Sequence, residues 1–222
     1  IVVSSRAAES TQALTKLQDQ HPENLHLLDL DVSDNAQVLQ ATSQTISLLE
    51  QIDLFFYNAG AYTPMKIEAW NLQEFEQINQ INYLGAVRLM IALKDHFLQQ
   101  GGGRWIWNIS LAADFGLPYG GAYSAPKAAL LNLAESLQPE LACHKIQLQV
   151  INHGFVKTRL TAKNDFAMLG LMEPEQAADK IIKIIQSNRF ETRCPWNLAM
   201  ILSLMKRLPK AWSLGITKKM LK

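Results

Sequence analysis

Tyr123 and Lys127 are the residues whose types and spacing most directly suggest chemistry, because they stand four positions apart at the start of a predicted helix. That spacing puts both side chains on one face of the helix. A free tyrosine has a pKa near ~10, and a neighbouring ammonium group favours the phenolate and lowers that value. Lys127 is therefore expected to make Tyr123 a usable acid and base at neutral pH. Taken alone, the same spacing also describes an ordinary pair on a helix surface.

Ser110 is a second candidate, thirteen residues before Tyr123 and directly after a predicted strand at 104–109. In an open parallel sheet, ligands bind beyond the carboxyl ends of the strands. A serine at that place can donate a hydrogen bond to a substrate carbonyl, although it can equally cap the end of the strand.

Strands and helices alternate along the rest of the chain. Apolar, β-branched and aromatic runs predict strands at 1–4, 25–30, 53–57, 104–109 and 146–151. Helices are predicted at 8–20, 34–50, 72–99, 121–143 and 174–187, with Ser33 or Asp34 capping the second and Pro174 opening the last. The alternation predicts an α/β fold with a doubly wound, mostly parallel sheet flanked by helices.

Composition argues against several classes of protein. The formal net charge of +1 gives no indication of a nucleic-acid partner. Cys143 and Cys194 lie far apart and form no CxxC pair, which argues against a metal site and fits a reducing compartment. The longest apolar stretches fall short of the ~18 residues that a membrane span needs. With no signal-peptide pattern after Ile1, we expect a cytoplasmic protein.

The spacing of Ser110, Tyr123 and Lys127 resembles that of the short-chain dehydrogenase/reductase family. Further family landmarks follow in order over roughly residues 1–190, namely Asp31-Val32, Asn58-Ala59-Gly60, Asn82, Pro118 and the segment 152–158. The resemblance implies a Rossmann-like NAD(P)-binding domain over 1–190, with strand order 3-2-1-4-5-6-7.

The resemblance also implies roles for individual residues. Tyr123 exchanges a proton with the substrate oxygen, and Lys127 lowers its pKa and holds the nicotinamide ribose. Ser110 orients and polarises the carbonyl, while Asn82 supports a water that links Lys127 to solvent. Cofactor contacts are implied for Asp31, Val32, Asn58, Ala59, Gly60, Tyr123, Lys127, Gly154, Val156 and Thr158.

The end of the strand at 1–4 favours NADP(H) over NAD(H). Ser5 and Arg6 stand where a carboxylate would otherwise bind a free ribose diol. Arg6 offers a planar fork suited to a 2′-phosphate, and Ser5 adds a hydroxyl. Alternatively, Arg6 is a solvated residue at a turn.

The sequence departs from the family pattern in two places. No Gly-x-Gly-x-x-Gly turn precedes the strand at 1–4, so the first strand of the sheet is missing from this sequence. We expect about thirty residues, one strand–helix unit, to precede Ile1 in the natural protein; without them, the edges of two neighbouring strands would be exposed. His153 replaces a proline, either as a tolerated change or as a titratable group near the site.

Two segments bear on substrate and partners. The segment 159–173 is placed like a substrate lid and is rich in apolar residues, which suits a hydrophobic substrate, although it can also pack on its own core. The tail 189–222 holds eight Lys/Arg and one acid. We expect 191–222 to be a basic amphipathic extension that packs on or beside the domain, or contacts an anionic membrane surface, the substrate cleft or a partner subunit.

The sequence therefore predicts an NADP(H)-dependent oxidoreductase that interconverts a carbonyl and an alcohol on a hydrophobic small molecule. Family resemblance implies a homodimer or homotetramer through the helices near 72–99 and 121–143. Two other hypotheses stay open. One is a non-catalytic nucleotide-binding or scaffold protein, if the N-terminal unit is naturally absent. The other is a membrane-associated, lipid-modifying member of the family.

Overall fold

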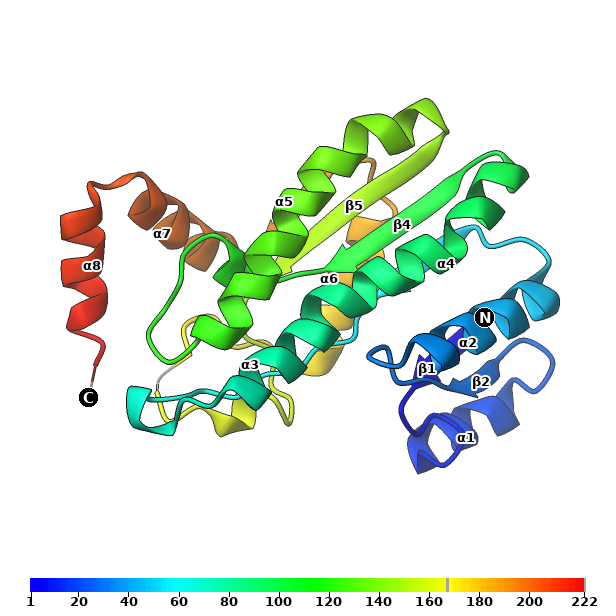
Figure 1. Ribbon diagram of the computed structural model, residues 1–222, viewed down its shortest axis with the longest axis horizontal. Coiled ribbons are helices and arrows are strands. Elements are labelled where there is room, and N and C mark those ends of the chain that lie inside the picture. Colours follow the sequence, from blue (N-terminus) through cyan, green and yellow to red (C-terminus); the bar gives the residue numbers. More distant parts are fainter. Residues whose placement is uncertain (167, 222) are drawn as a thin grey trace.

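The computed structural model describes residues 1–166 and 168–221. Ala167 and Lys222, which fall within the predicted lid and tail, lie outside the described residues. Helices flank a twisted sheet, with α4 and α5 crossing one face and α6 behind it (Figure 1). The strands β1 and β2 lie together at one end of the molecule, and α7 and α8 lie at the other.

All the strand pairs are parallel. The strands are β1 Val2–Ser5, β2 His26–Asp29, β3 Leu54–Tyr57, β4 Gly103–Asn108, β5 Ile146–His153 and β6 Glu191–Cys194. β1 pairs with β2, while the other four form a second sheet in the order β3-β4-β5-β6. Within the described residues β1 and β3 do not pair with each other, and the order expected from the family places a further strand between these two. The prediction of a parallel α/β sheet is confirmed, whereas the further N-terminal unit stays a prediction.

The described residues form eight α-helices, and the five predicted helical ranges all contain at least one of them. The eight helices are α1 Gln12–Gln20, α2 Asn35–Leu49, α3 Leu72–Asn79, α4 Gly85–Gln100, α5 Gly121–Cys143, α6 Pro174–Ile185, α7 Trp196–Arg207 and α8 Lys210–Lys218. Asp34 caps α2 by accepting from the backbone N–H groups of Ala36 and Gln37, so one of the two predicted caps is correct.

The helix predicted at 72–99 is not continuous. A π-helical turn, Gln80–Leu84, separates α3 from α4. The Tyr57 hydroxyl donates to the Ile81 carbonyl inside this turn. The absence of a side chain at Gly85 lets Tyr57 and Val32 pack against the backbone of this helix. A Cβ at that position would lie 2.5 Å from Tyr57 Oη and 2.8 Å from Val32 Cγ2. Such π turns often occur at functional sites, and this one contains Asn82.

The largest apolar cluster lies between the sheet and helices α2, α4 and α5. β4 contributes Trp105 and Trp107, both almost fully buried, and the Trp105 ring meets the Phe97 ring edge to face at 5.5 Å. The predicted extension from residue 191 begins with β6, which pairs with β5. The carboxyl ends of β3, β4, β5 and β6 therefore belong to one rigid layer.

Candidate active site

The predicted catalytic residues meet at the carboxyl ends of β3, β4 and β5. Ser110 follows β4 and is buried, and its hydroxyl lies 3.5 Å from the His153 carbonyl at the end of β5. The same oxygen accepts the backbone N–H of Ala112 at 3.1 Å. Tyr123 and Lys127 come from the first two turns of α5, as their spacing predicts. The structure thus brings together residues from a strand end and the following helix.

Burial controls the proton chemistry of Tyr123. Loss of solvent raises the pKa of the Tyr123 phenol above its usual value, and a hydrogen bond with Ser110 acts in the opposite direction. The sequence predicted a pKa lowered by Lys127, and this direction is wrong for the chain by itself. The Lys127 ammonium nitrogen lies 5.9 Å from the centre of the Tyr123 ring, over its face, and burial is the largest cause of the shift in the Tyr123 pKa.

Lys127 is buried beneath the site, and burial lowers the pKa of its side chain to about 8. Its Nζ donates to the Asn108 carbonyl at 3.0 Å. The side-chain nitrogen of Asn108 in turn donates to Asn58 Oδ1 at 2.7 Å. Asn108 therefore links Lys127 with the Asn58-Ala59-Gly60 turn after β3. Sequence reasoning missed Asn108, although a polar residue ending an apolar strand was a usable signal.

Asn82 is fully buried and holds the chain that follows β3. Its Oδ1 accepts the backbone N–H of Ala61 at 2.7 Å, and its Nδ2 donates to the Ala61 carbonyl at 2.9 Å. A Cβ on Gly60 would lie 3.7 Å from the same Oδ1. Asn82 therefore fixes the backbone after the predicted cofactor floor, and the water-supporting role that the resemblance implies stays a prediction.

Tyr62 stands next to Tyr123 and was not predicted. The two rings meet edge to face with centroids 5.2 Å apart. The Tyr62 hydroxyl donates to Asn164 Oδ1 at 2.7 Å, and Asn164 belongs to the predicted lid. Phe166 of the lid also meets the Phe155 ring at 5.9 Å. Tyr62 therefore connects the predicted lid with Tyr123, which is partly exposed.

The sequence and fold agree with a known family. A family model described as short chain dehydrogenase matches residues 1–168. The chain belongs to the short-chain dehydrogenase family. It is therefore an oxidoreductase of that family.

Several relatives extend this finding. An uncharacterized oxidoreductase from Myxococcus xanthus is 31% identical over 182 residues, which cover 82% of this chain and 72% of the relative. A fatty acyl-CoA reductase from Acinetobacter baylyi is 27% identical, with 83% of this chain and 64% of the relative covered. A solved short-chain dehydrogenase from Burkholderia cenocepacia, in complex with NADP, has a TM-score of 0.77 at 19% identity and covers 96% of both chains. That structural likeness shows the fold.

The residues predicted to meet the adenosine end of a dinucleotide lie at the ends of β1 and β2. Ser5 ends β1 and Arg6 follows it, and both are exposed, while Asp31 and Val32 follow β2. Hydrogen bonds from Ser33 lower the pKa of the Asp31 carboxyl, and the Arg6 charge acts in the same direction. Arg6 and Asp31, from the ends of the two strands, are therefore near enough to interact electrostatically.

The segment after β5 carries the remaining predicted contacts. The Gly154 N–H donates to the Cys194 carbonyl at 2.7 Å, and an added Cβ there would lie 3.0 Å from Leu198 Cδ2. Val156 forms a bridge with Met172. Thr158 is exposed, and its N–H donates to Thr161 Oγ1 at 2.9 Å. This segment therefore joins the lid to the sheet rather than standing free.

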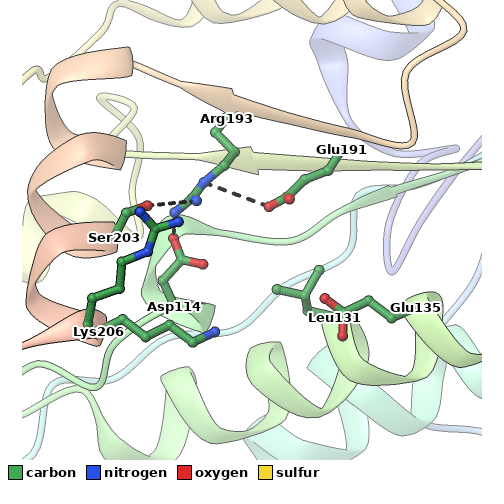
Figure 2. Close-up of a pocket in the computed structure, with 8 residues that line it drawn as sticks. Asp114, Leu131, Glu135, Glu191, Arg193, Ser203 and Lys206 are labelled. Atoms are coloured by element: carbon green, nitrogen blue, oxygen red, sulfur yellow. Dashed lines mark hydrogen bonds and ion pairs between the residues drawn. The ribbon is translucent and has the colours of Figure 1, made fainter.

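A charged pocket of about 310 Å³ lies beside the site, between α5, β6 and α7 (Figure 2). Arg193 forms an ion pair with Asp114, which lies four residues after Ser110, and its Nη1 donates to Ser203 of α7 at 2.8 Å. Glu191 lies 3.7 Å from Arg193 Nε. Arg193 therefore ties β6 and α7 to the turn that follows Ser110.

Proposed function

We propose that this protein is an NADP(H)-dependent oxidoreductase that interconverts a carbonyl and an alcohol on a hydrophobic small molecule, with Tyr123 as the acid and base. The observation that carries the proposal is the convergence of Ser110, Tyr123 and Lys127 at the carboxyl ends of neighbouring strands. A capping serine and a surface pair, the ordinary alternatives for these residues, would not give a buried lysine beneath a tyrosine that hydrogen-bonds to the serine.

A bound nicotinamide would supply the hydride, and the residues of this chain would handle the proton. In the reductive direction Tyr123, whose raised pKa keeps it protonated, donates its hydroxyl proton to the substrate oxygen. Ser110 donates a hydrogen bond to the same oxygen and so fixes its place. Lys127, with a pKa of about 8, can return a proton to Tyr123. Its carbonyl partner Asn108 holds that ammonium beneath the phenol.

The strand ends fit the nicotinamide-ribose end of a dinucleotide. Lys127 presents a buried donor, and Asn108 Oδ1 is buried without a hydrogen-bond partner within the described residues. A buried polar atom of this kind calls for a partner, and a ribose hydroxyl is a suitable one. The described residues include no glycine-rich turn for the pyrophosphate, so the fit covers the two ends of the cofactor and not its middle.

The preference for NADP(H) rests on Arg6. Its guanidinium is exposed at the end of β1, where it is free to meet a 2′-phosphate. The NADP bound by the Burkholderia cenocepacia protein of the same fold supports this choice. Arg6→Ala is expected to raise KM for NADPH about tenfold or more, the weight of one charge-assisted contact, and to leave KM for NADH unchanged. Equal effects on both cofactors would remove the basis for the preference.

A hydrophobic substrate is favoured by the lid. Within the described part of 159–173, Leu160, Leu169 and Leu171 are exposed, and Phe166 packs on Phe155. Exposed apolar side chains near a catalytic tyrosine can pack against an apolar substrate when the lid closes. The similarity to a fatty acyl-CoA reductase supports the same class of substrate.

Tyr123→Phe tests the function most simply. The variant keeps the ring and loses the proton, so NADPH oxidation with a panel of apolar aldehydes and ketones should fall at least ~100-fold. Tyr62→Phe is the matched control, because it removes a neighbouring hydroxyl that donates to Asn164 of the lid; it should change KM more than kcat. Wild-type activity in Tyr123→Phe would overturn the role of Tyr123 as the acid and base. A wild-type protein that binds NADPH and does not oxidise it with any member of the panel would favour the non-catalytic alternative.

We also propose a homo-oligomer that is formed through the outer faces of α4 and α5. Ile91 on α4 is exposed although it is a large apolar residue. Ile91→Glu should shift the mass measured by light scattering toward the monomer.

A further inference from the structure

The helix α7 has two apolar faces, and only one of them is covered. Leu198, Ala199, Leu202 and Met205 pack against Leu111 and Phe115. On the other side Trp196, Met200 and Leu204 recur every fourth residue, which places them in one stripe. Trp196 is 73% exposed and the other two are 59% exposed. A stripe of this size on a helix requires an explanation beyond packing within the chain.

The inner face of α7 is held firmly, so its outward stripe does not result from a loosely placed helix. Arg193 pairs with Asp114 and donates to Ser203 of α7, as Figure 2 shows. Asp114 is almost fully buried in this arrangement. The orientation of α7 is thereby fixed from both the apolar and the charged side.

The helix α8 has the reverse of the usual pattern for a surface helix. The residues that it buries are polar, Ser213 and Thr217. Trp212, Leu214 and Ile216 are exposed, Trp212 by 66%. A helix that met only water on its outer side would carry its polar residues there. In Figure 1, α7 and α8 project together at one end of the molecule, away from β1 and β2.

The charge of this region is equally one-sided. Residues 196–222 contain six Lys/Arg and no Asp/Glu, whereas the rest of the chain has 15 Lys/Arg against 20 Asp/Glu. Arg207, Lys210, Lys218 and Lys219 are all exposed. None of the helices in the described part of the chain is both long and apolar enough to cross a membrane.

We propose that α7 and α8 form an interfacial arm that binds the surface of an anionic membrane. Exposed tryptophans and aliphatic residues beside lysines on short helices are the chemistry that enters the headgroup region of a bilayer. A second copy of this chain is the poorer occupant, because symmetric pairing would bring two surfaces with no acidic residue together. The arm rests on different residues from the proposed catalysis, so each can fail without the other.

Vesicle co-sedimentation of the full chain tests the arm. Vesicles of phosphatidylcholine with 30% phosphatidylglycerol should bind the protein, and pure phosphatidylcholine should bind it at least ~10-fold more weakly. Each cation near an anionic surface strengthens binding by roughly fivefold, so Lys218→Gln/Lys219→Gln should weaken binding by about 10- to 30-fold. The control pair Lys16→Gln/Lys183→Gln, which removes two exposed lysines elsewhere, should have no such effect.

Fluorescence quenching by brominated lipid locates the contact. Quenching of the wild type should be lost in Trp196→Phe/Trp212→Phe and retained in Trp70→Phe, which changes an exposed tryptophan outside the arm. Binding that survives in the double variant with its quenching intact would overturn the proposal. So would the absence of binding to anionic vesicles, or a dimer in solution that Trp196→Ser/Leu204→Ser dissociates while vesicle binding is unaffected.

Discussion

Replacing Lys127 by methionine should reveal how much stability the fold gives up to keep a lysine beneath Tyr123. Lys127 is 3% exposed, and burial lowers its pKa from the 10.5 of a free lysine to about 8. Lys127 therefore loses its proton at lower pH in the folded state than in the unfolded state, and both states carry mostly the ammonium form at pH 7. At neutral pH the wild-type protein must bury a charge that methionine does not carry.

The magnitude follows from the two pKa values. The difference between the two pKa values means that the buried ammonium lowers the unfolding free energy of wild type by about 3 kcal/mol at pH 7. Methionine carries no charge, so Lys127→Met should not suffer this loss. Against this, the Asn108 carbonyl loses its donor, which costs about 1 to 3 kcal/mol and does not vary with pH. The net effect at pH 7 lies between zero and about 2 kcal/mol of stabilisation, so the pH dependence is the sharper observable.

The sign of that dependence is fixed. The unfolded chain binds more protons at this site than the folded chain between pH 8 and 10.5, so wild-type stability rises with pH in that window. The advantage of Lys127→Met over wild type should therefore shrink by about 1 kcal/mol between pH 7 and pH 9. Urea denaturation of both proteins at the two pH values, followed by circular dichroism, measures it.

Lys183→Met is the matched control, because it makes the same substitution at an exposed lysine. The difference in unfolding free energy between this variant and wild type should be the same at pH 7 and pH 9. An advantage of Lys127→Met that stays constant from pH 7 to pH 9 would refute the reasoning, since it would mean that Lys127 is not titrating in the folded protein. Loss of activity in the same variant would then report on binding geometry alone.

Three further substitutions test how the site is held. Asn82→Ala removes both bonds to the Ala61 backbone from a buried position and should cost about 2 to 3 kcal/mol in urea denaturation. Gly85→Ala places a methyl against Tyr57 and should cost about 1 to 3 kcal/mol, measured as a lower midpoint of thermal unfolding. Arg193→Ala breaks a largely buried ion pair and should cost about 3 kcal/mol, against less than about 0.5 kcal/mol for Lys94→Ala at an exposed pair. Equal losses for the two ion-pair variants would show that burial is not the cause.

Much of the catalytic arrangement could be predicted because it is local in sequence. Ser110, Tyr123 and Lys127 lie on one strand–turn–helix segment, so their spacing fixes their relative placement. The alternation of strands and helices could likewise be predicted, and Asp34, one of the two candidates for the cap of α2, is the cap in the structure. These signals depend on neighbours a few residues away, which a single sequence records.

The missed features depend on contacts between distant segments. Asn108 meets Asn58 across 50 residues, and Tyr62 meets Asn164 across 102. The predicted direction of the Tyr123 pKa shift was wrong because burial, which the sequence does not display, is the largest cause of that shift. The π turn around Asn82 likewise arises from packing against Tyr57.

The short strand β6 was missed for a related reason. Glu191–Cys194 has no apolar run, and only its pairing with β5 identifies it as a strand. The reversed polarity of α8 could be read as an amphipathic pattern, but which side faces outward is decided by the position of the helix on the fold. Sequence patterns give the periodicity of such elements, and the tertiary structure gives their direction.

Deuterium transfer tests the central claim most directly. The protein is incubated with NADPH that carries deuterium at the transferable position and with an apolar ketone, and the alcohol is analysed by mass spectrometry. The account predicts that wild type and Tyr62→Phe form an alcohol one mass unit heavier than the alcohol formed with unlabelled NADPH. Tyr123→Phe should form this labelled alcohol at least ~100-fold more slowly. Labelled alcohol formed at the wild-type rate by Tyr123→Phe would contradict the assignment of Tyr123 as the proton donor.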